Sequence, residues 1–325
     1  MTFTSHMVLA NNISELIDKL HNRDFMPLSQ TLSELNTHIT NPPGELTDSE
    51  VEALFYLTFY QTMTSELLSS SSIQQINAVS TVSKFSILLR LNLAKNAINQ
   101  QQHEKAIQTI VQLIDQNELS ASERTLGFAH LIYGLVDNNQ LTQVHKYVDM
   151  ALEAEHASLQ KQYGALLNLS FSYYYTKMHQ IDAAEKYLNL YVNYYLNEGE
   201  LTGLIDALYQ QSLFYRDFEF FEKAKPGLQK IIELSERIDN RYGAYYGLYG
   251  LARVLVLNGE IDEGIKLAQQ AISHPDSLPF YNELLHRELA KSFYSLNDKS
   301  SAIAHLESSI ALNQQLIAEG ATVSE

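Results

Sequence analysis

Residues 247–272 read GLYGLARVLVLNGEIDEGIKLAQQAI, and this stretch contains the pattern that decides the fold. Before its central turn, apolar or small residues recur at helical spacing at Leu248, Leu251, Ala252 and Leu255. After the turn, a second stripe of the same kind follows at Ile265, Ala268, Ala271 and Ile272. Each stripe is typical of one amphipathic helix, so the stretch predicts a hairpin of two helices.

The start of the second helix is repeated along the chain. Each copy has a polar turn that leads to a small or apolar residue, and the copies are residues 102–106, 140–144, 180–184, 219–224, 260–264 and 298–302. The last residues of these segments are spaced 38, 40, 40, 40 and 38 apart. A fixed period of this length indicates a repeat architecture in which every unit is one hairpin.

Small residues also occupy the middle of several first helices, at Ser172, Ser212, Ala252 and Ala290. Small side chains at the centre of both helices let the two helices of a hairpin approach closely. One hairpin cannot bury both of its apolar stripes alone, so neighbouring hairpins are expected to stack into an α-solenoid.

Composition agrees with an all-α protein and excludes several functions. The 325 residues include only 13 Gly and 6 Pro, which is too few for a turn-rich β fold. The formal charge of −16 argues against nucleic acid and anionic membranes as partners. No apolar run approaches the length of a membrane span, and no signal peptide is visible, so we expect a cytoplasmic protein.

The repeat resembles the tetratricopeptide family over roughly residues 84–317. The small residues of that family match Ala252, Gly264 and Ala271, with a turn glycine at Gly259 and a trailing Pro275. The units depart from the family because they run near 40 residues and lack its tryptophan. The resemblance implies an all-α, right-handed α-solenoid. Long units of this kind are similar to those in bacterial peptide-pheromone receptors, maltose-type activators and input modules of GGDEF cyclases.

The first 83 residues are less regular and are expected to cap residues 84–325 of the solenoid. One hairpin is predicted over residues 11–38, with a turn at 22–24. Thr47 and Glu50 have the spacing of a capping box, which predicts a helix start before the apolar run 51–60. Residues 69–72, four consecutive serines, are interpreted as a loop. A separate N-terminal domain is the alternative.

The sequence offers little evidence of chemistry. It lacks phosphate-binding loops, nucleophile elbows and clustered metal ligands, and with no cysteine it has no thiol nucleophile or zinc thiolate. We therefore expect no catalytic residues, no metal and no cofactor, and we expect that the protein is not an enzyme.

A binding groove is predicted on the first helices, because the resemblance implies that their positions 2, 5, 9 and 12 line a concave face. Counting from residues 125, 165, 205, 245 and 283 gives the candidate residues Tyr133, Tyr173, Tyr209, Arg216, Tyr246, Tyr249, Arg253, Arg287, Lys291 and Tyr294. Tyrosines give broad contacts, and the basic residues would attract an acidic peptide or a small anion. The alternative is that the arginines pair with acids on adjacent helices.

Two functions from different classes remain open. The first is a non-catalytic module that binds a protein or peptide segment in bacterial regulation or signalling. The alternative is a sensory input domain that signals to an output domain such as a GGDEF cyclase. Leu306, Ile310 and Ile317 form an apolar stripe on the last helix, and this stripe predicts a homodimer.

Overall fold

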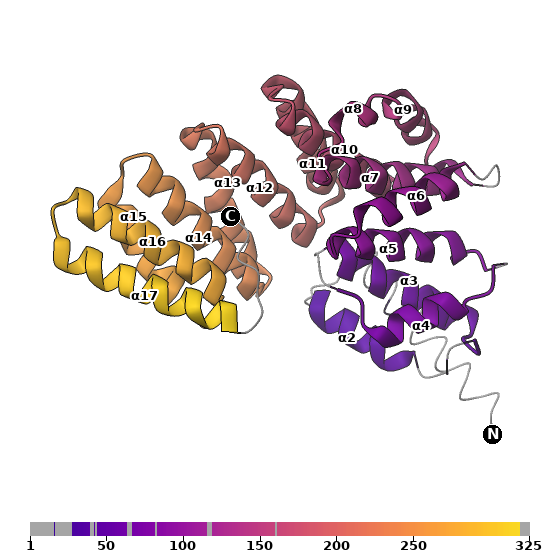
Figure 1. The fold of residues 1–325 in the computed structure, drawn as a ribbon, viewed down its shortest axis with the longest axis horizontal. Helices are drawn as coiled ribbons and strands as arrows, with labels where there is room; N and C mark the ends of the chain where they lie inside the picture. Colours follow the sequence, from indigo (N-terminus) through magenta and orange to yellow (C-terminus); the bar gives the residue numbers. More distant parts are fainter. Residues whose placement is uncertain are drawn as a thin grey trace. The chain divides into compact units, whose positions relative to one another are not determined.

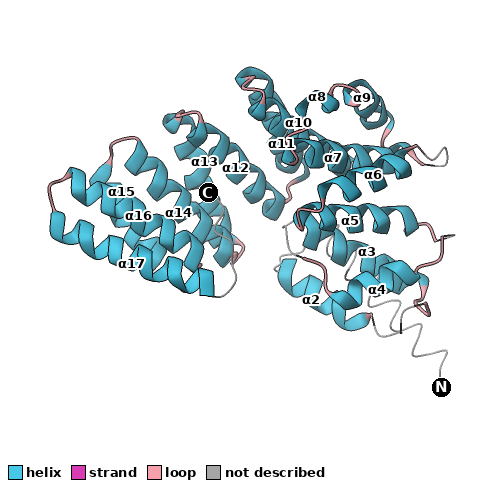
Figure 2. Ribbon diagram, in the orientation of Figure 1, coloured by secondary structure: helices cyan, strands magenta, loops and turns pink. Residues whose placement is uncertain are grey.

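The computed structural model describes Leu16 and residues 28–318, apart from positions 40, 41, 43, 64–66, 82, 116–118 and 160. Within this part of the chain all regular structure is helical, as Figure 2 shows. The described helices are α2 (Leu28–His38), α3 (Asp48–Met63), α4 (Ser70–Ala78), α5 (Ser86–Asn99), α6 (His103–Ile114), α7 (Ala121–Asp137), α8 (Leu141–Val144), α9 (Val148–Ala157), α10 (Lys161–Lys177), α11 (Ile181–Glu198), α12 (Leu201–Asp217), α13 (Phe221–Arg237), α14 (Arg241–Leu257), α15 (Ile261–Ile272), α16 (Pro279–Ser295) and α17 (Lys299–Ala318).

The predicted hairpins are confirmed. The six repeated segments coincide with the starts of α6, α8, α11, α13, α15 and α17, the second helices of successive hairpins (Figure 1). Their last residues are all buried, and those with side chains larger than glycine's are at most 3% exposed: Ala106, Val144, Ala184, Ala224 and Ala302. At Gly264 a Cβ atom would lie 2.6 Å from Val256 and 3.2 Å from the carbonyl oxygen of Ala252. The small residues therefore permit the close approach that the sequence predicts.

The turns inside the hairpins share one backbone conformation. The residue that closes each turn has a positive φ, between 54° and 87°, and these residues are Gln101, Asn139, His179, Glu219, Gly259 and Asn297. They follow the same spacing as the repeated segments. Only one of the six is glycine, the residue that adopts this conformation without steric cost.

Two expectations about local structure are wrong. Residues 69–72 are not a loop, because Ser69 caps α4 by accepting a 3.0 Å hydrogen bond from the backbone N–H of Ser72. Serine favours helix N-caps for this reason, and the four serines start a helix. The second helix of the hairpin near residue 144 is also interrupted, since α8 ends at Val144 and α9 begins at Val148.

The chain forms two compact units, Met1–Tyr194 and Tyr195–Glu325, and the boundary falls inside α11. In the first unit, α3 packs against α5, and the rings of Phe55 and Phe85 stack with centroids 5.3 Å apart. The predicted capping box at the start of α3 is confirmed, with Thr47 and Glu50 exchanging hydrogen bonds of 2.9 and 3.3 Å. The predicted boundary after residue 83 stays a prediction, and the hairpin at 11–38 lies outside the described residues except for Leu16 and α2.

In the second unit, helices α12 to α17 pack as three hairpins in chain order. Glycines on α14 allow α13 of the preceding hairpin to lie close to it. A Cβ atom at Gly250 would be 2.5 Å from Leu228, and one at Gly247 would be 2.6 Å from Ile232. The first helices also touch one another, because α14 contacts both α12 and α16. These contacts place the three first helices of the unit beside one another.

None of the helices described combines the length and apolar character that crossing a bilayer requires.

Candidate functional site

A row of tyrosines crosses the three first helices of the second unit. Tyr209 of α12 contacts Tyr246 of α14, with ring centroids 5.5 Å apart. Tyr246 in turn meets Tyr281 of α16 edge-on at 5.4 Å, and Tyr249 lies 4.8 Å from the same ring. We call Tyr209, Tyr246, Tyr249 and Tyr281 the tyrosine row. Since three of the four are only half-buried, the row presents aromatic surface along the aligned helix faces.

The phenols of the row are neutral hydrogen-bonding groups. Burial raises the pKa of Tyr281 to about 12, and it raises the pKa of Tyr209 and Tyr246 as well. The pKa of Tyr249 is also raised by burial, although the neighbouring Arg253 opposes the shift. The row can therefore donate or accept hydrogen bonds at neutral pH without carrying a charge.

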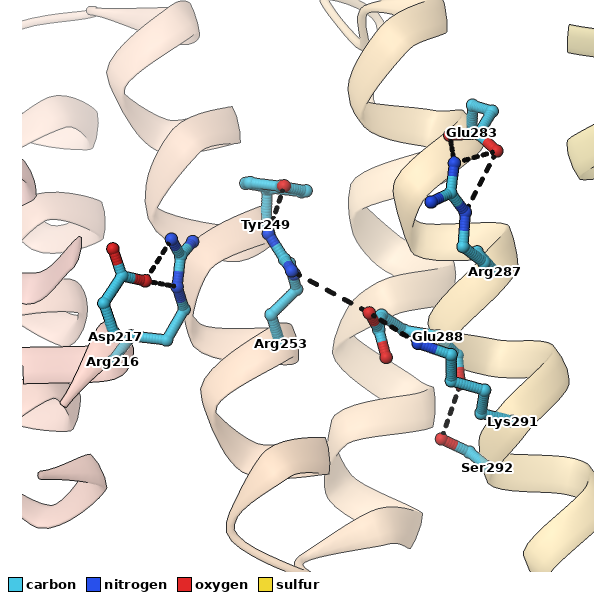
Figure 3. Close-up of polar contacts among 9 residues, drawn as sticks. All are labelled: Arg216, Asp217, Tyr249, Arg253, Glu283, Arg287, Glu288, Lys291 and Ser292. Atoms are coloured by element: carbon cyan, nitrogen blue, oxygen red, sulfur yellow. Dashed lines mark hydrogen bonds and ion pairs between the residues drawn. The ribbon is translucent and has the colours of Figure 1, made fainter. Parts of the chain in front are cut away.

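Basic side chains with acidic partners lie on the same helices, and Figure 3 shows them together with Tyr249 of the row. Arg253 donates a 2.9 Å hydrogen bond from Nη1 to the Tyr249 hydroxyl, and its Nη2 lies 3.8 Å from Oε1 of Glu288. The ammonium group of Lys291 lies 3.5 Å from the same oxygen. Arg216 forms hydrogen bonds of 2.6 and 2.8 Å with Asp217. The positive charges of this face are thus largely balanced by carboxylates.

Arg287 belongs to a tighter arrangement. Its Nη2 donates to both oxygens of Glu283 at 2.9 Å, one helical turn earlier on α16. Glu283 is 1% exposed and also accepts a 2.7 Å hydrogen bond from Ser309 of α17. A bidentate pair to a buried carboxylate is a strong interaction, and the same carboxylate links the two helices of the last hairpin through Ser309.

The first unit holds a smaller aromatic pair. Tyr133 of α7 and Tyr173 of α10 lie 5.7 Å apart. The Nζ of Lys95 lies 4.3 Å from the centroid of the Tyr133 ring, and Lys177 lies over Tyr173 at 5.3 Å. Lys95 is only 5% exposed, and burial lowers its pKa to about 8. Each tyrosine of the pair is thus covered by an ammonium group.

The ten predicted groove residues divide between the two units. Tyr133 and Tyr173 meet in the first unit, and the other eight lie in the second. Tyr209, Tyr246 and Tyr249 are brought together in the tyrosine row with Arg253 at its side, whereas Tyr294 is 70% exposed and belongs to none of these contacts. Tyr249 is 2% exposed, so its ring is part of the core.

The alternative interpretation, in which the arginines pair with acids on adjacent helices, applies to one of the three arginines. Arg253 faces an acid on the adjacent helix, Glu288 of α16. Arg216 and Arg287 pair instead with acids of their own helices. All three arginines therefore have carboxylate partners.

Two important residues were missed. Tyr281 was left out because it precedes residue 283, where the count along its helix began. The helix itself, α16, begins at Pro279. Proline is common at the first position of a helix, and this signal could have shown that Tyr281 belongs to the helix. Glu288 was not recognised because its link to Arg253 spans 35 positions of the chain and depends on side-chain directions. In the described residues no group of three or more side chains is arranged to hold a metal ion.

Together these features define an all-α, tetratricopeptide-like helical-repeat protein. No family model matches the sequence, and no curated protein matches it either. Solved structures do share the fold. A Rap protein complexed with competence and sporulation factor aligns with a TM-score of 0.58 and 11% identity, over 96% of this chain and 98% of that one. BtubC (BKLC) from P. vanneervenii aligns with a TM-score of 0.55 and 11% identity, over 68% of this chain and 92% of that one. At such low identity the likeness concerns the fold alone.

Proposed function

We propose that this protein is a non-catalytic regulatory module that binds a peptide segment along the first helices of its second unit. The observation that carries the proposal is the tyrosine row, which runs over α12, α14 and α16 through ring contacts of 4.8 to 5.5 Å. A repeated helix face of this kind suits an extended or helical segment better than a compact metabolite. Likeness in fold to a Rap protein solved with competence and sporulation factor supports a peptide ligand.

The face supplies both parts of a peptide site. Tyr209, Tyr246 and Tyr281 offer half-buried aromatic surface with hydroxyl groups, which favours apolar side chains and backbone amides of a ligand. Arg253 offers the charge that a ligand carboxylate would use. Its contact with Glu288 is 3.8 Å, which is longer than a hydrogen bond, so this pair is easier to exchange than the bidentate pair at Arg287.

Peptide display on the immobilised full chain tests the proposal, followed by calorimetry of the selected peptides. Tyr246→Ala and Arg253→Ala should each weaken binding by about tenfold or more, as expected for anchor residues. Lys266→Ala, which removes an exposed positive charge from the second helix α15, is the matched control and should leave affinity unchanged. Equal affinity of all three variants for every selected peptide would show that the ligand binds elsewhere.

A further inference from the structure

The last described helix, α17, carries large apolar side chains on an exposed face. Ile303, Leu306, Ile310 and Ile317 are 55%, 47%, 56% and 65% exposed. With Asn313 between the last two, the positions 303, 306, 310, 313 and 317 follow alternating steps of three and four residues. We call these five residues the α17 seam. Steps of three and four give the heptad pattern of helices that pair side by side.

The position of Leu306 is covered by the next hairpin in the two earlier hairpins of this unit. Alignment of Ala302 with Ala224 places Leu306 at the position of Leu228, which is 1% exposed and packs closely on Gly250 of α14. Alignment with Gly264 places Leu306 at Ala268, which is 2% exposed. Within the residues that the structure describes, no further helix packs on this face of α17.

The residue types in the seam specify a helix as the occupant. β-Branched isoleucine occupies the first position of each heptad, and Leu306 occupies the fourth, which is the combination that favours two-stranded pairing. Asn313 takes the next fourth position. A polar residue in such a seam lowers the stability of the pair. An apolar face that does not pair with another helix would not require this pattern.

The charge of the helix points to a second copy of this chain. Between residues 299 and 318 the only formally charged side chains are Lys299 and Glu307, which cancel, although the whole chain carries −16. Two acidic molecules repel over most of their surfaces, and a neutral face is the place where two copies can meet. We propose that the protein forms a twofold dimer through the α17 seam, with Ile310 at the centre.

The dimer does not depend on peptide binding, and its strength follows from the seam's length. Residues 303–317 span about 21 Å at about 1.5 Å per residue, which is two heptads. Two heptads with one polar position give a weak, concentration-dependent pair. In either orientation of the partner helix, the central Ile310 lies close to the same residue of the second copy.

Sedimentation equilibrium of the full chain across the micromolar range tests the proposal. The wild type should associate to a dimer, Ile310→Glu should be a monomer, and Asn313→Leu should tighten the dimer by tenfold or more. Ala304→Glu is the matched control, because residue 304 is exposed on α17 but lies outside the seam. Circular dichroism confirms that each variant is folded. A wild type that stays monomeric at every concentration would overturn the proposal, as would an Ile310→Glu variant that still dimerises.

A second measurement reports on proximity rather than on association. Because the chain has no cysteine, Ile310→Cys introduces a unique thiol. Mild oxidation should join two copies of this variant by a disulfide, whereas Ala304→Cys should stay monomeric under the same conditions. Equal cross-linking of the two variants would show random collision and contradict the seam.

Discussion

The guanidinium group of Arg253 donates a 2.9 Å hydrogen bond to the hydroxyl of Tyr249, one helical turn earlier on α14. The tyrosine ring is buried, and the arginine lies over it with 5.6 Å between the guanidinium carbon and the ring centroid. The ring therefore fixes the direction of the arginine, which points toward Glu288 on α16. An arginine held in this way loses little side-chain entropy when it binds a carboxylate.

Removal of the Tyr249 hydroxyl should loosen Arg253. Tyr249→Phe keeps the buried ring and removes the acceptor, so we expect a loss of about 1 kcal/mol in the free energy of unfolding. Urea denaturation followed by circular dichroism measures this loss. Tyr242→Phe, at a tyrosine of the same helix that is 54% exposed, should change nothing. In a double-mutant cycle, additivity of Tyr249→Phe and Arg253→Ala would contradict the coupling.

Neutralisation of Glu288 should favour acidic ligands. Glu288→Gln removes the carboxylate that faces both Arg253 and Lys291, so two positive charges become available to a ligand. Calorimetry with selected peptides should show tighter binding of those that bear Asp or Glu, by about tenfold per recovered charge pair. Neutral peptides of the same length should bind as before. Tighter binding of both kinds would mean that the effect is not electrostatic.

The buried His130 should make the first unit sensitive to acid. It is 2% exposed, and burial, together with the charge of Lys95, lowers its pKa to about 3. In the unfolded chain the histidine has a pKa of about 6.5, so the unfolded state takes up a proton before the folded state does. The free energy of unfolding therefore falls as the pH drops from about 7 toward 3, by up to about 1.4 kcal/mol per pH unit.

His130→Leu removes this contribution. The free energy of unfolding of the variant, measured by urea denaturation, should therefore fall by about 1–2 kcal/mol less between pH 7.5 and pH 5 than that of the wild type. His156→Gln, at an exposed position, should keep the pH dependence of the wild type. If His130→Leu shows the full acid sensitivity, another group causes it.

The positive φ angles in the hairpin turns lead us to expect opposite changes in stability for substitutions at Glu219 and Gly259. Glu219→Gly should stabilise the protein by about 0.5–1 kcal/mol, since glycine adopts φ 61° without the strain of a side chain. Gly259→Ala should destabilise it by about 1 kcal/mol, although the added methyl group would meet nothing within 4 Å. Thermal unfolding of both variants measures the signs. The same sign for both would show that backbone strain is not the cause.

Much of the fold follows from the sequence because the repeat encodes it locally. The small residue that ends each repeated segment is needed for helix contact, and burial of Ala224 and Ala302 bears out that reasoning. Local signals failed where two of them compete. Serine favours loops and helix N-caps alike, and the cap at Ser69 decided the outcome in favour of α4.

The candidate site was less predictable because it depends on contacts between hairpins. The positions implied by the tetratricopeptide resemblance placed Tyr209 and Tyr246 on one face, and the structure brings their rings together. Tyr281 was omitted because it lies between Pro279, where α16 begins, and residue 283, where the count began. The pairing of each arginine with an acid depends on side-chain direction, which residue spacing does not specify.

The order in which the helices touch also bears on how the chain folds during its synthesis. α13 contacts α12 and α14, and α16 contacts α14, α15 and α17, so these partners are near neighbours in the chain. Low contact order of this kind permits rapid folding. Each hairpin finds its contacts among residues that are close in the chain, and α12, the partner that α13 needs from the preceding side, is synthesised before it.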